Sequence, residues 1–126
     1  ADLRAFLADD VAEAANHRDA LGRILADHGA PAQEHRDQAM ARILSEARGW
    51  ADQIDTPAVR DAALIASAQR IQHYEIAVYG TLAAWAKLLG LDKDLGVLLT
   101  MLGEERKADA TLTEMAMSGV NQRAAA

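Results

Sequence analysis

Hydrophobic and polar residues follow one another along this chain with the period of amphipathic helices. Apolar residues return every three or four positions, which places them on one side of an α-helix. Short stretches with Gly, Pro or Asp interrupt the pattern, and such residues end one helix or begin the next. The pattern predicts four helices, over about residues 3–27, 32–53, 57–89 and 93–117.

The residues between these segments supply the expected helix ends. Gly29 follows the first segment and is expected to end it. Thr56 is the expected cap of the third helix, with Pro57 at its first position. Asp92 can cap the fourth helix, and the tail of residues 121–126 is expected to fray.

The composition is typical of closely packed helices in one domain. Hydrophobic residues make up 51% of the 126 residues, aromatic residues only 4%, and there are two prolines. Much of the apolar content is alanine and leucine, and β-branched residues are scarce, which favours helices over a sheet. We therefore expect one domain over residues 1–126, an all-α four-helix bundle with three long helices and one shorter helix.

Charge and cysteine content exclude several classes of protein. The formal net charge is −6, from 13 basic and 19 acidic residues with no basic run, so nucleic acid is not expected as a partner. No apolar stretch approaches the roughly 20 residues needed to span a membrane. The chain has no cysteine, which excludes disulfides and thiolate metal sites. No signal peptide is visible, and a cytoplasmic protein is expected.

The third predicted helix carries polar residues where its buried side should be apolar. Its stripe is apolar at both ends, but Gln72 and Glu75 lie in the middle. A buried, unpaired carboxylate is costly, so Glu75 needs a proton, a cationic partner or a metal ion. Tyr79, one turn further on, can support such a site by hydrogen bonding or can be an ordinary core aromatic. His73 points away from Glu75 on the helical wheel and is not an expected ligand.

The first and fourth predicted helices carry matching polar groups. Asp10, Glu13 and His17 share one face of the first helix, and Glu105 and Asp109 lie one turn apart on the fourth. Each set lies near the middle of its helix, so antiparallel packing can bring the sets to one level. Carboxylate and imidazole groups arranged in this way bind iron, manganese or zinc inside helical bundles.

Each of these groups also has a structural interpretation. Asp10 and Glu13 can lie on a solvated edge of the first helix, and His17 can be a packed core histidine. The acidic pair of the fourth helix can be solvated, since the neighbouring Glu104 and Lys107 suit a surface. Moreover, the Glu-x-x-His pair that is usual in di-metal bundles does not occur here.

Two segments carry a family resemblance. Residues 57–90 contain the run Gln-His-Tyr-Glu at 72–75, and residues 102–115 begin Leu-Gly-Glu-Glu-Arg-Lys-Ala-Asp. Both segments resemble the YciE/YciF-like family of ferritin-like proteins, and residues 33–53 and 2–28 resemble it less closely. The resemblance implies a ferritin-like bundle, usually a homodimer, with a di-metal centre between its helices and a link to bacterial stress response.

The resemblance also assigns residues. Glu75, Glu105 and Asp109 match acidic positions of the family, and Glu13 matches a Glu of its His-Leu-Glu-Glu-Thr segment. The chain departs from the family in having Asp10 in place of a His and a Gln at position 72 in place of a Glu. A counterpart of the family's first long helix is also missing from the pattern, which would leave the site short of one Glu and expose an apolar groove.

We therefore expect a ferritin-like protein that binds one or two transition-metal ions, with iron favoured over manganese and zinc, and that handles oxygen, peroxide or iron in a stress response. The alternatives are a non-catalytic dimerising bundle, whose polar layer only fixes helix register, and a ligand-binding groove left by the missing helix. The expected metal ligands are Glu13, Glu75, Glu105 and Asp109, and Asp10 and His17 are the second choices. Gln72 and Tyr79 are expected to support the ligands by hydrogen bonding.

Overall fold

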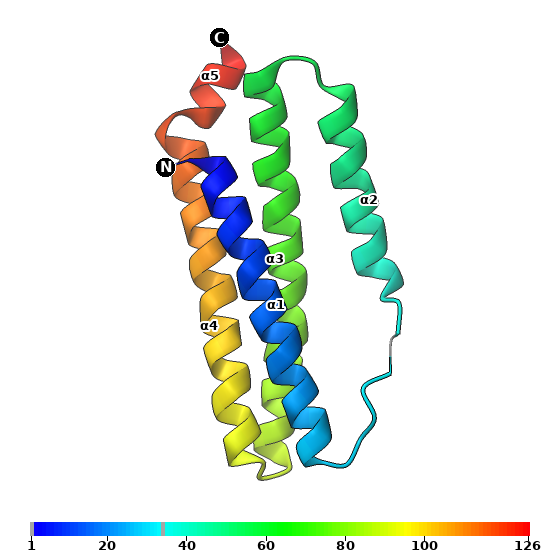
Figure 1. Cartoon of the computed structure of the whole chain (residues 1–126). Coiled ribbons are helices and arrows are strands. Elements are labelled where there is room, and N and C mark those ends of the chain that lie inside the picture. The colour runs from blue at the N-terminus through cyan, green and yellow to red at the C-terminus, as the bar shows by residue number, and fades with distance from the viewer. Residues whose placement is uncertain (1, 34) are drawn as a thin grey trace.

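The computed structural model describes residues 2–33 and 35–126, and every regular element among them is helical (Figure 1). The predicted all-α fold is therefore confirmed. The elements in chain order are α1 (Leu3–Asp27), α2 (Gln38–Gln53), α3 (Pro57–Leu88), α4 (Asp92–Met115), the π-helical turn η1 (Ala116–Val120) and the short α5 (Asn121–Ala125).

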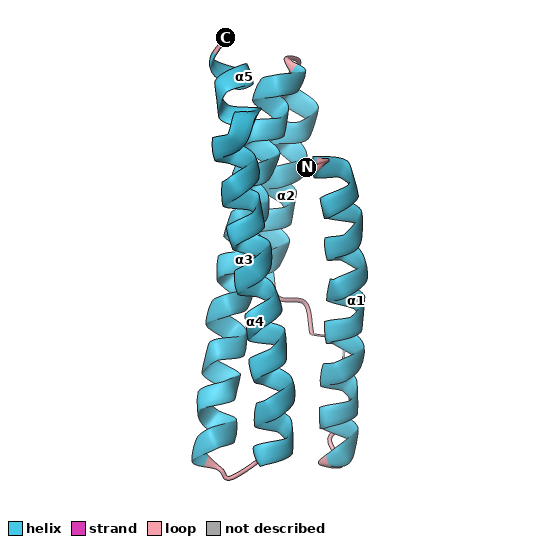
Figure 2. Ribbon diagram, turned by 90° about the vertical axis from the view of Figure 1, so that its left-hand side faces the viewer, coloured by secondary structure: helices cyan, strands magenta, loops and turns pink. Residues whose placement is uncertain are grey.

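The helices form an elongated bundle. α3 and α4 run antiparallel and pack closely together, and α2 lies on the side of α3 away from α4 (Figure 1). α1 lies across the front of the α3–α4 pair, and Figure 2 shows it standing slightly apart from them. The middle of α1 therefore faces both long helices, and this is where the polar groups of the three helices meet.

Two of the predicted helix starts need correction. α2 begins at Gln38 instead of about residue 32, because the side chain of Asp37 accepts a hydrogen bond from the Met40 amide and caps the helix there. Residue 34, within that predicted extension, lies outside the described residues. At α4, Leu91 occupies the cap position in place of Asp92, which is already helical.

Other boundaries agree in part with the sequence. Gly29 ends α1 with a φ of 66°, as expected. Thr56 occupies the cap position of α3, although its side chain makes no capping bond. The tail does not fray as predicted but forms α5. A kink at Gly119 (φ 157°) returns the chain to the bundle, where Val120 is buried in the core and holds the tail in place.

The core has a polar layer between apolar layers. Gln72, Glu105 and His17 are only 1%, 4% and 3% exposed. This arrangement agrees with the stripe of α3, which is apolar at both ends and polar in the middle. The upper apolar layer contains Ile65, Ala68, Leu112, Met115 and Val120; the lower one contains Tyr79, Met101, Leu102, Ala83, Ala86 and Leu98.

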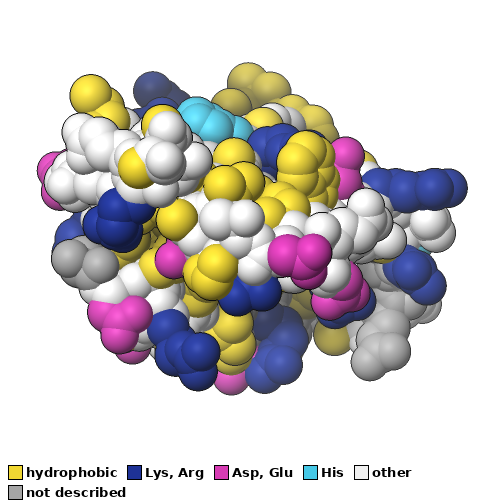
Figure 3. Space-filling view, turned by 90° about the horizontal axis from the view of Figure 1, so that it is seen from above, with side chains coloured by type: hydrophobic (Ala, Val, Ile, Leu, Met, Phe, Trp, Pro, Cys, Tyr) yellow, Lys and Arg dark blue, Asp and Glu magenta, His cyan; other side chains and the backbone are white. Residues whose placement is uncertain are grey.

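Helix composition and the view from above describe the outside of the bundle. None of the helices in the described part of the chain combines the length and apolarity needed to cross a bilayer. Seen from above, Lys and Arg side chains are interspersed with acidic and apolar ones (Figure 3). This face therefore does not carry the continuous basic surface that binds phosphate backbones.

Candidate metal centre

His17 lies at the centre of the polar layer, between two glutamates of α4. Its Nε2 atom is 2.7 Å from Oε2 of Glu104, and its Nδ1 atom is 3.0 Å from Oε1 of Glu105. The ring of Tyr79 packs edge-on against the imidazole, with ring centroids 5.5 Å apart and an interplanar angle of 90°. These contacts from α3 and α4 fix the orientation of a histidine that belongs to α1.

A second set of contacts joins α1 to α3. The side-chain amide of Gln72 donates a hydrogen bond of 2.9 Å to Oδ1 of Asp10. Among the described residues, neither the other end of the same amide, Oε1, nor the buried Nδ1 of His17 has a hydrogen-bond partner, although Nδ1 lies 3.0 Å from Oε1 of Glu105. A buried polar atom left unpaired costs about 1–3 kcal/mol. Both atoms lie in the polar layer of the core.

The carboxyl groups of Glu75 and Glu105 lie together in this layer. Burial, and then the nearby carboxylates of Glu75, Asp10, Glu13 and Glu104, together raise the pKa of Glu105 to about 8. Burial also raises the pKa of Glu75, and the charge of Asp10 adds to this, while His17 and a hydrogen bond with Glu105 act in the opposite direction. Without a cation, the carboxyl group of Glu105 therefore retains a proton at neutral pH.

The carboxyl groups of α1 respond to the same surroundings. Burial raises the pKa of Asp10, opposed by the hydrogen bond from Gln72 and by the charge of His17. Burial and then the charge of Glu104 raise the pKa of Glu13, while Lys107 lowers it. Repulsion among these groups is the electrostatic condition that a bound cation relieves.

One arrangement within the layer has the dimensions of a metal site. Ligand atoms of Glu13, His17 and Glu104 all lie within 4.8 Å of one another. The sequence interpretation placed Glu104 on the surface, and its side chain is indeed 42% exposed, but it also contacts His17. The adjacent pair Glu104 and Glu105 straddles the face of α4 that meets α1. In the sequence, the signal that pointed to Glu104 as a ligand candidate was its position directly before Glu105.

The predicted candidates do not all meet. Asp10, Glu13, His17, Gln72, Glu75 and Glu105 come together, with Tyr79 packed against His17. Asp109 instead accepts a hydrogen bond of 3.1 Å from Gln69 and lies 3.4 Å from Nε2 of His73. The His73 side chain is 66% exposed, in agreement with its expected outward position.

A cavity of about 380 Å³ between α1 and α4 gives access to the polar layer. Asp10, Glu13 and Glu104 line it, and Lys107 lies beside them. Because acidic side chains line this approach, it attracts cations from solvent. Glu105 and His17 do not line the cavity and are buried, whereas Glu13 and Glu104 in its wall are partly exposed.

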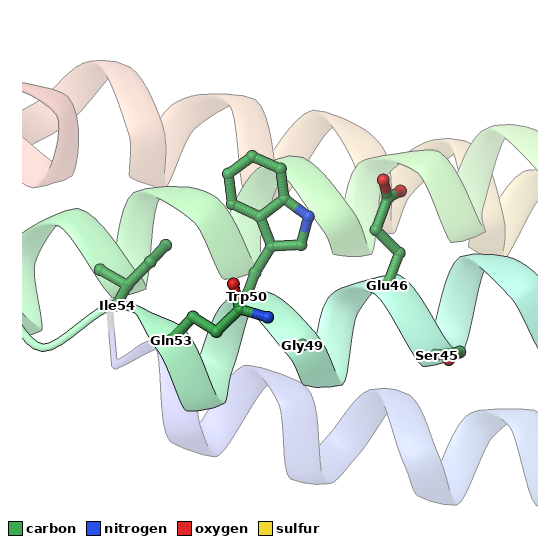
Figure 4. A pocket seen from close by; sticks show the side chains of 6 residues that line it. All are labelled: Ser45, Glu46, Gly49, Trp50, Gln53 and Ile54. Carbon is green, nitrogen blue, oxygen red and sulfur yellow. The ribbon is translucent and has the colours of Figure 1, made fainter.

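Another hollow, on α2, offers no comparable chemistry. It is lined by residues of the C-terminal half of that helix and by Ile54 just after it, and Glu46 and Trp50 project from the helix there (Figure 4). Glu46 is the acidic group of the hollow, and it pairs with Arg70 of α3. A single carboxylate that already has a cationic partner does not form a metal site.

Comparison with known proteins agrees with the family resemblance. Protein YciF of Escherichia coli (strain K12) is 45% identical over 86 residues, which are 68% of this chain and 52% of that protein. The chain thus spans about half the length of this curated relative. The crystal structure of the E. coli stress protein YciF is similar with a TM-score of 0.86 and 33% identity, covering 92% of this chain and 74% of that one.

A second solved structure and a family profile complete the comparison. YcfI from Rhodopseudomonas palustris has a TM-score of 0.84 and 36% identity, covering 89% of this chain and 71% of that one. The profile described as "Domain of unknown function (DUF892)" matches residues 1–125. The chain therefore belongs to the DUF892 family, which confirms the resemblance to YciF-like proteins.

Proposed function

We propose that this protein binds a transition-metal ion in its polar layer, through Glu13, His17 and Glu104. The observation that carries the proposal is a nearly buried imidazole held between carboxylates, 2.7 and 3.0 Å from its two nitrogens. Glu105, on the Nδ1 side, would orient the ring while Nε2 binds the ion. Metal-binding histidines commonly have such a carboxylate behind them.

The donor set fits a borderline or hard divalent cation. Imidazole and carboxylate ligands suit iron, manganese and zinc, and the chain has no cysteine to favour softer ions. Iron is the ion that we propose. A second ion would draw on Asp10, Glu75 and Glu105, because burial raises the pKa of each carboxyl group and a nearby cation would favour its ionised form.

The chain itself supplies the surroundings that such an ion requires. Tyr79 packs against His17 and closes the lower side of the layer, and Gln72 holds Asp10 in place. Apolar layers lie above and below these groups. A bound iron or manganese ion would supply redox chemistry toward oxygen or peroxide. The description of YciF as a stress protein is consistent with that role.

A second candidate is a purely structural role for the polar layer. The bond from Gln72 to Asp10 and the contact of His17 with Glu104 already tie α1 to α3 and α4 without a metal ion. Buried polar contacts of this kind can fix the register of helices. On this view the two unpaired atoms, Nδ1 of His17 and Oε1 of Gln72, are tolerated defects.

Metal analysis and thermal melting separate the two candidates. Protein produced in iron-supplemented medium is expected to carry one or two ions per chain, and added Fe²⁺, Mn²⁺ or Zn²⁺ is expected to raise the melting temperature. Saturation at about 100 times Kd stabilises a fold by about 2.7 kcal/mol. Glu13→Gln should remove this response, because Glu13 is one of the three proposed ligands. The substitution leaves the hydrogen bond from Gln72 to Asp10 intact.

The matched control is Asp109→Asn, the same loss of one carboxylate on a residue that contacts Gln69 instead of the polar layer. It should keep the metal response. Wild-type protein that carries less than roughly a tenth of an ion per chain, with a melting temperature unchanged by all three cations, would leave the structural role as the explanation.

A further inference from the structure

A second cavity lies at the lower end of the bundle, where the last turns of α1 face the end of α3 and the start of α4. Its volume is about 410 Å³, within the usual range for small-ligand sites. Its wall consists of leucine, isoleucine, alanine and tryptophan side chains, with two polar residues, His28 and Asp94. An apolar layer that includes Tyr79, Met101 and Leu102 lies between this cavity and the candidate metal centre.

The polar pair in this wall is unusual for an apolar cavity. Asp94 is only 6% exposed, and its Oδ2 atom is 2.6 Å from Nε2 of His28. The His28 side chain is 45% exposed at the rim, just after the end of α1. A buried carboxylate is costly without a partner, so Asp94 needs the group that it contacts. That partner lies at the surface, so a ligand reaches the same carboxylate by displacing the imidazole of His28.

The rim of the cavity exposes large apolar side chains. Trp85 is 59% exposed, Leu89 69% and Leu25 40%, and all three line the cavity. Together with the apolar wall they offer a ligand hydrocarbon contact on several sides. Trp85 can also contact the face of a cationic group, because aromatic rings attract cations.

We propose that this cavity binds a small amphiphilic amine, with its hydrocarbon body against the apolar wall and its ammonium group on Asp94. The carboxylate decides the charge of the ligand. A cation gains a charge-assisted hydrogen bond there, whereas a carboxylate ligand meets a like charge at close range. The net charge of −6 acts in the same direction over longer distances. This site is independent of the proposed metal function.

Fluorescence of Trp85 reports binding directly. The chain has two tryptophans, and Trp50 lies on α2, outside the cavity (Figure 4). In a Trp50→Phe background, octylamine, octanol and octanoate share one hydrocarbon chain and differ in charge, and each is titrated below its micelle concentration. Octylamine should shift the Trp85 emission saturably, with an affinity about tenfold higher than that of octanol, and octanoate should bind most weakly.

Two variants test the role of the polar pair in opposite directions. Asp94→Asn should reduce the affinity for octylamine to that for octanol, with octanol binding unchanged. His28→Ala removes the competing partner of Asp94 and should strengthen octylamine binding, a result that a loss of folding cannot produce. Glu13→Gln should leave all three titrations unchanged. The proposal is overturned if octylamine does not bind saturably, if octanoate binds as tightly, or if His28→Ala weakens octylamine binding.

Discussion

Glu105→Gln should stabilise the metal-free protein at neutral pH. Glu105 is only 4% exposed, and burial together with neighbouring carboxylates raises its pKa from 4.5 to about 8. In the unfolded chain at pH 7 this carboxyl group is ionised, whereas in the folded chain it holds a proton. Folding must therefore take up a proton, and this lowers the free energy of unfolding. Glutamine has nearly the same shape and requires no proton.

The size of the effect follows from the difference in pKa. Each pKa unit that separates 4.5 from the working pH corresponds to about 1.4 kcal/mol, so at pH 7 the substitution should contribute about 3 kcal/mol. For a chain of this length, that corresponds to a rise of roughly 10 °C in melting temperature. The loss of any favourable contact between the carboxyl group of Glu105 and His17 reduces this value.

The sign of the pH dependence provides a sharper test. The folded-state pKa lies above the unfolded value, so the stability contributed by Glu105 is fully present below pH 4.5 and is lost as the pH rises to about 8. Wild-type stability should thus fall across this interval, by up to about 1.4 kcal/mol per pH unit from this group. Glu105→Gln should show a smaller fall.

Urea unfolding at several pH values, in the presence of a chelator, measures both quantities. Glu114→Gln is the matched control, because it makes the same chemical change at an exposed position of α4. It should leave the pH profile of the wild type unchanged. If Glu105→Gln is no more stable than the wild type at pH 7 and has the same pH slope, the inference that Glu105 is buried in protonated form is wrong.

Three further outcomes are expected. Gln72→Glu adds a carboxylate to the polar layer, so it should destabilise the metal-free protein at neutral pH and raise its affinity for Fe²⁺ or Mn²⁺, as measured by melting with and without metal. Tyr74→Phe removes the 2.5 Å hydrogen bond to Asp37 at the start of α2, and it should cost about 0.5–1.5 kcal/mol and speed amide exchange in α2. Leu112→Ala removes a side chain with 0% exposure and should cost about 2–5 kcal/mol in urea unfolding.

The presence of helices α1 to α4 could be predicted from the sequence, because helical periodicity is local information. The start of α2 and the existence of α5 do not. Asp37 begins α2 at a point that depends on its contact with Tyr74 of α3 as well as on its own capping bond. The tail is helical because Val120 reaches the core around Gly119, and that contact exists only in the assembled bundle. Tertiary contacts overrule local preference in both places.

The candidate site was predictable to the extent that it depends on helix faces. Glu75 interrupts an apolar stripe, and that signal led to the polar layer. The choice among acidic residues of α4 depended on how α4 is rotated toward α1. That rotation turns Glu104 and Glu105 toward His17 and turns Asp109 toward Gln69. Spacing within one helix cannot supply this angle, because it is set by packing between helices.

The same geometry couples the docking of α1 to the state of the acidic layer. α1 contacts the bundle through apolar residues near its two ends, such as Phe6 and Leu21, and through His17 at its centre. The central contact brings Asp10 and Glu13 close to Glu105, so ionisation of the layer opposes the docking that the apolar ends favour. Protons relieve this opposition at low pH, and a divalent cation would relieve it at neutral pH, when the carboxyl groups tend to ionise. Binding of metal and closure of α1 onto α3 and α4 would then be one equilibrium, and the helix that contributes His17 would also be the part of the fold that metal stabilises most.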